Sequence, residues 1–337
     1  MQDYDLAVVI GRFQPFHNGH FALINEAHKI AENVLVMVGS CDSPRSIRNP
    51  FRFQERANMI RSACLRHPGM ESWLGIVGIS DHFYNDEGWL DGVQTKINTH
   101  IYDEAIGPRV VIVGHDKDST SYYLKLFPQY DTVNIDNHMG IDATTIREAY
   151  FKAKRIGLCD LPDSTYEFLT DFQDTKAYDD LVLEFDYIEQ YKQDWSEAPY
   201  PPTFVTVDAV VVCSGHVLLI RRKDAPGKGL LALPGGFLDP SETLLEGAVR
   251  ELIEETRLKM PARALQKPDE QHVFDHPQRS MRGRTITHGF FFHLEPGKLP
   301  EVRGGSDASE AMWVPLSDLD PENMFEDHIH IIRHFVR

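Results

Sequence analysis

The feature that most limits how this chain can fold is a proline-rich break just past its middle. Residues 196–202 read SEAPYPP, and three prolines within seven residues are incompatible with both a helix and a central strand. A chain of 337 residues is also too long for one ordinary core and suits two domains of roughly 150 residues each. We therefore predict a first domain over residues 1–195, a linker over residues 196–202 and a second domain over residues 203–337.

Before the break, short apolar runs alternate with stretches that can be helical, such as His20–Ala31 and Phe53–Ala63. This alternation predicts βαβ units, and hence an α/β fold with a doubly wound parallel sheet. Toward the break the chain becomes mostly helical, with Leu181, Phe185 and Ile188 spaced to share one helical face. The predicted strands are Leu6–Ile10, Val34–Val38, Trp73–Ile79, Arg109–Val113 and Thr132–Ile135.

After the break the pattern is that of an α+β domain. Phe204–Cys213 and Val217–Arg221 flank Ser214–Gly215 as the strands of a hairpin flank its turn. We expect a helix over Leu244–Glu255, further strands, and a last helix near Glu326–Val336.

The first candidate site is the turn Gly11–His20, which reads GRFQPFHNGH directly after the first predicted strand. In open α/β sheets, phosphates bind at the carboxyl ends of strands, against the N-terminus of the next helix. Glycine at position 11 would let a ligand approach the backbone, and glycine at position 19 would permit a tight turn into the helix. His17 and His20 then carry ring donors that can reach phosphate oxygens, so we predict a phosphate site here.

In these residues the segment resembles the HxGH nucleotidyltransferase superfamily, which transfers nucleotidyl groups from nucleoside triphosphates on a Rossmann-like sheet. Further matches narrow the resemblance to the archaeal-type nicotinamide mononucleotide (NMN) adenylyltransferases. In the segment Ile141–Arg147 (IDATTIR), Asp142 stands where the family's second ATP-binding signature has serine. The other matching residues are Gly39–Ser40, Asn49–Phe51, Glu55–Arg56, Asn85, Trp89 and Gly114.

This resemblance implies that the NMN phosphate attacks the α-phosphorus of ATP directly, with Mg²⁺ neutralising the triphosphate. Trp89 would stack on the nicotinamide, with core packing as the alternative, and Asn85 would hydrogen-bond near the nicotinamide amide. The catalytic charges would come from His17, His20, Arg12 and Arg147. The expected ATP-binding residues are Gly11, Phe13, Gly19, Gly114 and Thr144, and the expected NMN-binding residues are Ser40, Asn85 and Trp89.

The second candidate site is a glutamate-rich helix. Glu251, Glu254 and Glu255 lie at i, i+3 and i+4, so a helix places their carboxylates on one side. Such a face is commonly just solvated, but three crowded carboxylates also favour a hard cation, Mg²⁺ or Mn²⁺. The run resembles the Nudix box, G-x5-E-x7-R-E-U-x-E-E-x-G-U with U aliphatic. The matching residues are Gly236, Glu242, Arg250, Glu251, Leu252, Glu254, Glu255 and Leu258.

The Nudix resemblance implies a pyrophosphohydrolase in which Mg²⁺ bridges the glutamates and a diphosphate and activates water. The carbonyl of Gly235 is expected as a further ligand, and Glu242 and Arg250 are expected to pair and brace the loop against the helix. Arg257 replaces the last glycine of the box, so we expect a longer or altered helix end without loss of the metal ligands.

Residues outside the box resemble Nudix ADP-ribose pyrophosphatases. Arg279, Arg282 and Arg284 lie within RSMRGRTITHG, and Asp307–Glu310 precedes WVPL. We expect these arginines to bind the terminal ribose phosphate or the diphosphate of ADP-ribose, although a solvated hairpin fits them equally. Glu310 is a candidate for a catalytic carboxylate outside the box.

An HxGH domain followed by a Nudix domain resembles, over nearly the full length, the bifunctional NMN adenylyltransferase/Nudix hydrolases of NAD metabolism. The second domain would cleave ADP-ribose to AMP and ribose 5-phosphate. The alternatives for it are another nucleoside diphosphate derivative, such as NADH or a dinucleoside polyphosphate, or a role as an ADP-ribose sensor.

The overall charge and composition favour small-molecule partners, namely ATP, NMN and ADP-ribose. A formal charge of −17 argues against nucleic-acid binding, and no apolar run approaches the roughly 20 residues of a membrane helix. The four cysteines show no CxxC spacing and suit a reducing compartment. Because the first residues are no signal peptide, we expect a cytoplasmic enzyme and leave a homo-oligomer open.

Overall fold

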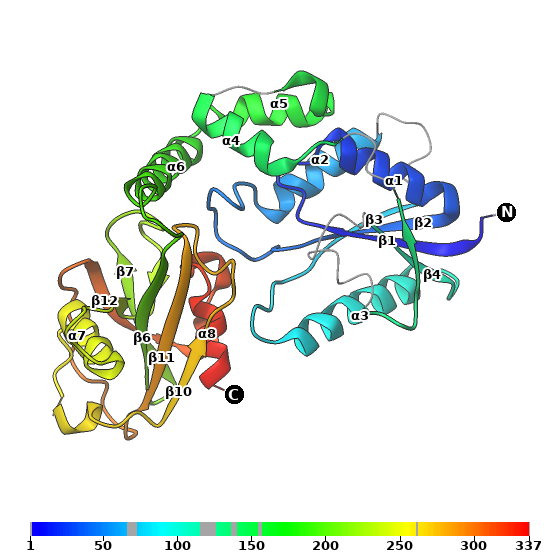
Figure 1. Cartoon of the computed structure of the whole chain (residues 1–337). Helices are drawn as coiled ribbons and strands as arrows, with labels where there is room; N and C mark the ends of the chain where they lie inside the picture. The colour runs from blue at the N-terminus through cyan, green and yellow to red at the C-terminus, as the bar shows by residue number, and fades with distance from the viewer. Residues whose placement is uncertain are drawn as a thin grey trace. The chain divides into compact units, whose positions relative to one another are not determined.

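The computed structural model describes residues 2–65, 73–114, 126–135, 140–153, 157–260 and 262–336. The chain divides into two compact units, a first unit over Met1–Leu183 and a second unit over Glu184–Arg337 (Figure 1). The division falls inside helix α6 (Lys176–Asp194), so the last turns of this helix belong to the second unit. Residues 196–202 contain neither helix nor strand, as their prolines require.

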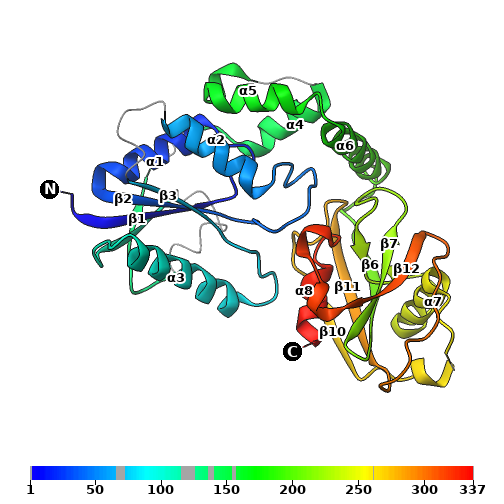
Figure 2. The same ribbon diagram turned by 180° about the vertical axis from the view of Figure 1, so that it is seen from behind.

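The first unit is built on a parallel five-stranded sheet in the order β3-β2-β1-β4-β5, which confirms the predicted doubly wound fold. Helices α1 (Asn18–Ile30) and α2 (Phe53–Leu65) cover one face of this sheet, and α3 (Asp86–Asp103) covers the other (Figures 1 and 2). The strands are β1 (Tyr4–Gly11), β2 (Ala31–Val38), β3 (Leu74–Gly78), β4 (Val110–Gly114) and β5 (Asp131–Asn134).

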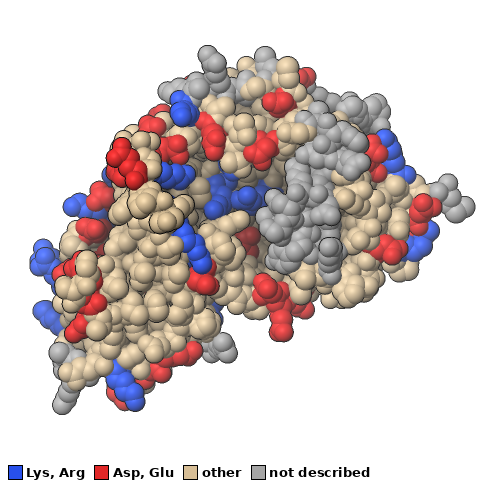
Figure 3. Space-filling view, in the orientation of Figure 1, with Lys and Arg blue, Asp and Glu red and all other residues tan. Residues whose placement is uncertain are grey.

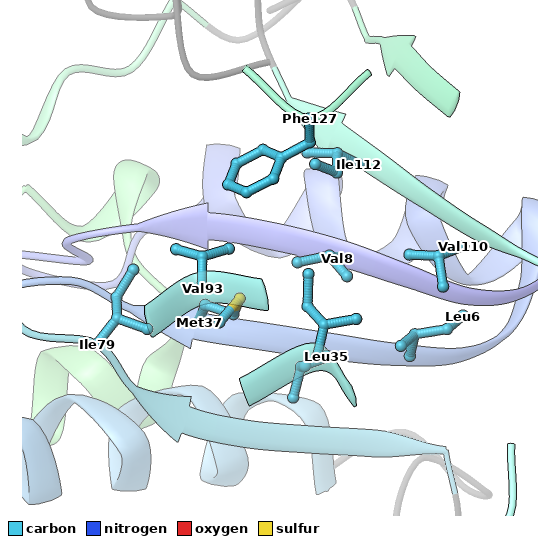
Figure 4. Close-up of a cluster of buried hydrophobic side chains, with 10 residues drawn as sticks. Leu6, Val8, Leu35, Met37, Ile79, Val93, Val110, Ile112 and Phe127 are labelled. Atoms are coloured by element: carbon cyan, nitrogen blue, oxygen red, sulfur yellow. The ribbon is translucent and has the colours of Figure 1, made fainter. Parts of the chain in front are cut away.

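The core of this unit follows from the period-two geometry of its strands. Leu6 and Val8 of β1 lie beside Leu35 and Met37 of β2 on the α3 face of the sheet, together with Val93 of that helix (Figure 4). The intervening strand residues point to the opposite face and are buried there as well. Burial on both faces explains why the strands read as continuous apolar runs.

A helical segment completes the first unit with α4 (Ala143–Ala153), α5 (Asp163–Phe172) and the start of α6. Two buried tyrosines join these helices: the hydroxyl of Tyr150 donates to the carbonyl of Leu169 at 2.7 Å, and that of Tyr178 donates to the carbonyl of Tyr150 at 2.8 Å. Each phenol therefore buries its ring without leaving its hydroxyl unsatisfied.

The second unit contains a mixed seven-stranded sheet with the path β10-β11-β6-β7-β12, to which β8 and β9 add at β7 and β6. Helix α7 (Leu244–Thr256) packs on one face through Ala248 and Leu252, and α8 (His328–Phe335) lies on the other (Figure 1). The strands are β6 (Thr203–Cys213), β7 (His216–Arg222), β8 (Leu231–Ala232), β9 (Gly235–Phe237), β10 (Glu270–Phe274), β11 (Arg284–His293) and β12 (Ala308–Pro315).

The predicted hairpin of this unit is confirmed. Ser214 and Gly215 have φ values of 47° and 75°, and they connect antiparallel β6 and β7 through the pairs Cys213–His216 and Val212–Val217. Two consecutive left-handed residues give the turn whose twist matches that of the strands.

The described surface agrees with the acidic composition. Acidic and basic side chains are interspersed over the face seen in Figure 3, where the coloured residues form no broad basic surface. None of the described helices combines the length and the low polarity that crossing a bilayer would require. All four cysteines are free thiols.

Candidate active sites

The predicted site of the first unit lies where three parallel strands end side by side. Gly11 ends β1, Gly39 and Ser40 directly follow β2, and Gly114 ends β4. The neighbours of β1 are β2 on one side and β4 on the other, so the strand order reverses here. Ligands of open α/β sheets bind at such a switch point, outside the carboxyl ends of the strands.

His17 and His20 cap helix α1 reciprocally. Nδ1 of His17 accepts the backbone N–H of His20, and Nδ1 of His20 accepts the backbone N–H of His17, both at 3.3 Å. The two rings stack with their centroids 3.5 Å apart. Because each Nδ1 is an acceptor, a neutral ring carries its proton on Nε2, where it is a donor. The helix dipole at the same point favours anionic ligands.

The two glycines of this turn make room for aromatic rings. A Cβ at Gly11 would come within 2.9 Å of the ring of Phe13, and a Cβ at Gly19 would lie 3.1 Å from the ring of His17. Gly19 lies inside α1 and does not have a positive φ, so the tight turn predicted for it is wrong. Phe13 is buried with a φ of 54°, and its ring meets His20 edge-on at 4.8 Å between centroids.

Arg147 links the turn after β1 to helix α4. Its Nη1 donates to the carbonyl of Gln14 at 2.6 Å, and its Nη2 donates to Oγ1 of Thr144 at 3.2 Å. Burial, together with the nearby positive charge of Arg12, lowers the pKa of Arg147 to about 10. The two predicted arginines therefore lie close enough to repel each other, which an anion between them would relieve.

Asp142, which stands where the family signature has serine, has a capping role in the structure. Its carboxylate accepts the backbone N–H of Thr145 at 2.9 Å and so caps the start of α4. Desolvation lowers the pKa of Arg12, while the negative charges of Asp81 and Asp142 raise it. Asp142 therefore also places a counter-charge near Arg12.

Arg56, which was not among the predicted site residues, ties the strand ends together. Its Nη1 donates to the carbonyls of Arg12 at 2.7 Å and Gly39 at 2.6 Å, and its Nη2 donates to that of Ser40 at 2.9 Å. Arg56 is 1% exposed, and burial lowers its pKa to about 10. Its only signal in the sequence was its place in the family resemblance. Ser40 is itself buried, with a φ of 51°.

The residues expected near the nicotinamide have structural partners of their own. Oδ1 of Asn85 accepts the N–H of Gly88 at 2.9 Å and caps α3. Trp89 is partly buried against the core of Figure 4, with its ring centroid 6.0 Å from that of Phe127. Core packing, the alternative weighed for Trp89, is therefore observed, and its stacking on a ligand stays a prediction.

In the second unit, Arg250 binds three glutamates around it. Its Nε and Nη2 donate to both carboxylate oxygens of Glu242 at 2.9 and 2.7 Å, which is the predicted brace, and these bonds lower the pKa of Glu242 to about 2. Its Nη1 lies 2.9 Å from Glu251 and 3.3 Å from Glu254. The repulsion expected between these two glutamates is thus already offset by one guanidinium.

Glu255 differs from its two neighbours because it is buried. Its residue is 4% exposed, and its Oε2 accepts the backbone N–H of Gly235 at 3.0 Å. Desolvation raises its pKa to about 8, helped by the charge of Glu251, and desolvation also raises the pKa of Glu251. A buried carboxyl group without a neutralising cation is the type of group that a bound metal ion stabilises.

The surroundings of these carboxylates fit a hard divalent cation. A Cβ at Gly235 would come within 2.3 Å of the carbonyl of Val207, and one at Gly236 within 2.4 Å of Oε1 of Glu251. Glycine at these two positions therefore lets β9 pack closely against β6 and against Glu251. Among the described residues, no three acidic, histidine or cysteine side chains already converge on one point, and Arg250 lies between two of them.

The end of α7 corrects one prediction. Arg257 adopts the left-handed conformation, with φ 47° and ψ 36°, so the helix stops where the glycine of the family pattern would stop it. The loop that follows β11 covers this end: the N–H of Arg303 donates to Thr256 and that of Gly305 to Glu255. The same loop brings Asp307 close to the glutamates, because its charge raises the pKa of both Glu251 and Glu255.

Glu310, the candidate carboxylate outside the box, lies elsewhere. It is exposed on β12 and pairs with Nε of Arg221 at 3.4 Å. Asp307 is thus the acidic residue that the fold brings near the glutamates. The sequence pointed to the segment Asp307–Glu310 through the family resemblance, but it did not show which of its acidic residues lies near the glutamates.

The three predicted arginines have three different environments. Arg279 is buried and forms a bidentate ion pair with the fully buried Asp327, with both N–O distances 2.9 Å. This ion pair gives Arg279 a structural role, and its contact with ADP-ribose stays a prediction. Arg284 bonds the carbonyl of Asp275 at the edge of the sheet, and Arg282 lies over the ring of Phe237 with its guanidinium carbon 5.3 Å from the centroid.

Comparison with known proteins matches both halves of the chain. Residues 8–154 match the cytidylyltransferase-like family and residues 202–335 the NUDIX domain family. A nicotinamide/nicotinic acid mononucleotide adenylyltransferase of Acinetobacter baylyi is 37% identical over 186 residues, which cover 55% of this chain and 95% of that protein. An ADP-ribose pyrophosphatase of Methanocaldococcus jannaschii is 38% identical over 133 residues, which cover 40% of this chain and 73% of that protein.

A solved structure matches both units at once. It is the crystal structure of a bifunctional NMN adenylyltransferase/ADP-ribose pyrophosphatase from Francisella tularensis, complexed with AMP and a manganese ion. The match has a TM-score of 0.93 and 37% sequence identity, and covers 99% of this chain and 98% of that one.

Proposed function

This chain belongs to the family of bifunctional enzymes that join an NMN adenylyltransferase to an ADP-ribose pyrophosphatase, and we propose that it carries out both reactions. The first unit would transfer the adenylyl group of ATP to NMN, giving NAD and pyrophosphate. The second would hydrolyse ADP-ribose to AMP and ribose 5-phosphate. The observation that carries this proposal is the presence of two sites in one chain. The first is a helix capped by two histidines at the point where the strand order of the parallel sheet reverses. The second is a buried glutamate that packs against a strand containing two glycines.

In the first reaction, an oxygen of the NMN phosphate attacks the α-phosphorus of ATP, and the bond to the departing pyrophosphate breaks. Catalysis of this kind is positioning and charge stabilisation rather than covalent chemistry. The Nε2 donors of His17 and His20 would hold phosphate oxygens at the N-terminus of α1. Arg12 and Arg147 would supply positive charge, and Arg56 would keep the strand ends in register.

In the second reaction, water attacks a phosphorus of the diphosphate and the bridging P–O bond breaks. Glu251, Glu254, Glu255 and the carbonyl of Gly235 are the residues that would hold a divalent cation, Mg²⁺ or Mn²⁺. When bound, this cation supplies charge neutralisation of the diphosphate and activation of the water. Glu255 must give up its proton before it can act as a ligand, and Asp307 is the nearby carboxylate that can accept a proton from water.

Two assays on the full chain test the proposal. ATP and Mg²⁺ are incubated with NMN, or with nicotinic acid mononucleotide, and the dinucleotide and pyrophosphate are measured. ADP-ribose and Mg²⁺ are incubated separately, and AMP and ribose 5-phosphate are measured, with NADH and a dinucleoside polyphosphate as competing substrates.

The two sites provide each other's controls. His20→Ala should remove dinucleotide synthesis and leave ADP-ribose hydrolysis intact, and Glu255→Gln should do the reverse. An enzyme that makes no dinucleotide from either mononucleotide contradicts the first half of the proposal. If ADP-ribose binds but is never hydrolysed with either metal, the second unit is a sensor and the second half is wrong.

A further inference from the structure

A row of aromatic rings runs along one edge of the second unit. The ring of Phe204 lies at its centre, with centroids 5.2 Å from Trp195, 5.6 Å from Tyr191 and 5.9 Å from Phe237, all near-perpendicular or tilted. Trp195 is 46% exposed and Phe237 is 40% exposed. We call these four residues the aromatic row. A cluster of exposed aromatic side chains is uncommon on a protein surface that binds no ligand, and such clusters often mark binding sites.

The row is assembled from three separate segments. Tyr191 is in the last turns of α6 and Trp195 directly follows them, Phe204 begins β6, and Phe237 ends β9. Phe237 pairs with position 206 of β6, so it lies on the same face of the sheet as Phe204. The chain that carries Arg282 crosses this face closely, because a Cβ at Gly283 would lie 3.2 Å from the ring of Phe204.

Two arginines lie over aromatic rings of this unit, one of them in the row. Arg282 lies over the ring of Phe237, and Arg222 lies over that of Phe325 at 4.0 Å. Burial lowers the pKa of Arg222, with Arg282 acting in the same direction and Glu326 and Glu255 opposing it. Arg222 is therefore near enough to both Arg282 and the buried Glu255 to be affected by their charges.

Among the residues that the structure describes, neither arginine has an ion-pair partner. Within the described residues, Arg282 hydrogen-bonds Ser280, and Arg222 donates from Nε to the carbonyl of Pro226 at 2.8 Å. No carboxylate in the same part of the chain lies within 4.0 Å of either guanidinium. Positive charge left uncompensated beside aromatic faces complements a ligand that joins an aromatic ring to a diphosphate.

We propose that the aromatic row is the base-binding subsite of the hydrolase, where adenine stacks on Trp195 and Phe237 while Arg282 and Arg222 hold the diphosphate beside Glu255. This rests on the proposed hydrolysis of ADP-ribose and deepens it. It assigns Trp195, which follows the helix that links the two units, a direct contact with the substrate of the second unit. Base stacking on an aromatic side chain accounts for an affinity change of roughly 5- to 150-fold.

The two products of hydrolysis provide the test, because AMP carries the base and ribose 5-phosphate does not. Trp195→Ala and Phe237→Ala should each raise KM for ADP-ribose about tenfold or more, with kcat within a factor of a few, since stacking binds substrate and transition state alike. The inhibition constant of AMP should rise by a similar factor, and that of ribose 5-phosphate should not change. Trp195→Phe, which keeps a ring, should restore most of the affinity.

Tyr200→Ala is the matched control, because Tyr200 is an aromatic residue close by in the chain that is 81% exposed and outside the row. Its kinetic constants should be those of the wild type. Unchanged AMP inhibition in both row variants overturns the inference, and so does an equal rise for AMP and ribose 5-phosphate, which indicates general damage. If the variants alter only the sedimentation coefficient, the row is a self-association surface and the inference is wrong.

Calorimetric titration with AMP separates this inference from the proposed function. If the wild type fails to hydrolyse ADP-ribose yet binds AMP, and Trp195→Ala weakens that binding at least tenfold, the subsite stands although the proposed reaction fails. If the wild type hydrolyses ADP-ribose and Trp195→Ala binds AMP equally well, the reaction stands and the subsite fails.

Discussion

Replacing Glu255 by glutamine should stabilise the metal-free second unit while removing its hydrolase activity. The carboxyl group is 4% exposed and accepts one backbone N–H from Gly235. The side-chain oxygen of glutamine can accept the same hydrogen bond at nearly the same volume, but it cannot carry the charge that a metal ligand must have. Function and stability therefore oppose each other at this position.

The size of the effect follows from the pKa of Glu255, which burial raises from 4.5 to about 8. As the pH rises above 4.5, the unfolded chain loses this proton first, so stability falls until the folded protein also loses it near pH 8. Each unit of pKa difference corresponds to about 1.4 kcal/mol. The glutamine variant should therefore exceed the wild type by about 1 kcal/mol at pH 5.5, about 3 kcal/mol at pH 7 and about 5 kcal/mol above pH 8.

The measurement is thermal and urea unfolding of both proteins in EDTA at these three pH values. Calorimetry separates the transitions of the two units, and Mg²⁺ identifies that of the second unit by raising its midpoint in the wild type only. Hydrolysis of ADP-ribose by Glu255→Gln should be at least about a hundredfold slower, whereas NAD synthesis should be unchanged. Glu254→Gln is the matched control, because its half-exposed side chain is already solvated and should give no pH-dependent gap.

Two outcomes would refute this reasoning. A stability gap that stays constant between pH 5.5 and 8.5 means that Glu255 does not titrate in this range when folded. A glutamine variant that is less stable than the wild type at pH 8.5 means that the charged carboxylate has a favourable partner in the fold.

Three further predictions concern other positions. His20→Ala should slow NAD synthesis about 10²- to 10³-fold, because it deletes a phosphate donor; a rate within threefold of the wild type would remove His20 from catalysis. Arg257→Gly should raise the unfolding free energy of the second unit by roughly 1 kcal/mol, since glycine tolerates the left-handed conformation, and a loss of stability in urea would contradict this. Asp327→Asn should lower the free energy of unfolding by about 3–5 kcal/mol, because it leaves the buried charge of Arg279 unpaired. The double variant Arg279→Met with Asp327→Leu should lower it much less, because it removes both charges. Equal losses for the two variants in calorimetry would be evidence against a true ion pair.

Local patterns in the sequence were sufficient for the elements and for much of both sites. Apolar runs and helical stretches predicted β1 to β5 within three residues at each end. The signal is clearest for β1 and β2, because a strand buried on both faces must be apolar throughout. The spacing of Glu251, Glu254 and Glu255 predicted one helical face, and the pairing of Glu242 with Arg250 was correct. Each of these inferences depends on residues within about a dozen positions of each other.

The partners of several similar side chains could be assigned only from the folded structure. Three arginines lie within six positions of the sequence, yet Arg279 is buried against Asp327, which lies 48 residues away, and Arg282 lies over an aromatic ring. Burial and charge partners are properties of segments that meet in space, and the sequence around one arginine contains neither.

The same limit explains the residues that sequence reasoning missed. Asp307 and Arg222 reach the glutamates through a loop and a strand end that are distant in sequence, and Trp195 follows a helix that the pattern assigned to the first domain. The periodicities, the hairpin turn and the spacing of the carboxylates were predictable because they depend on local geometry. The depth at which Glu255 is buried, and hence its pKa, was decided by the packing of β9 and of the loop carrying Gly305 against α7.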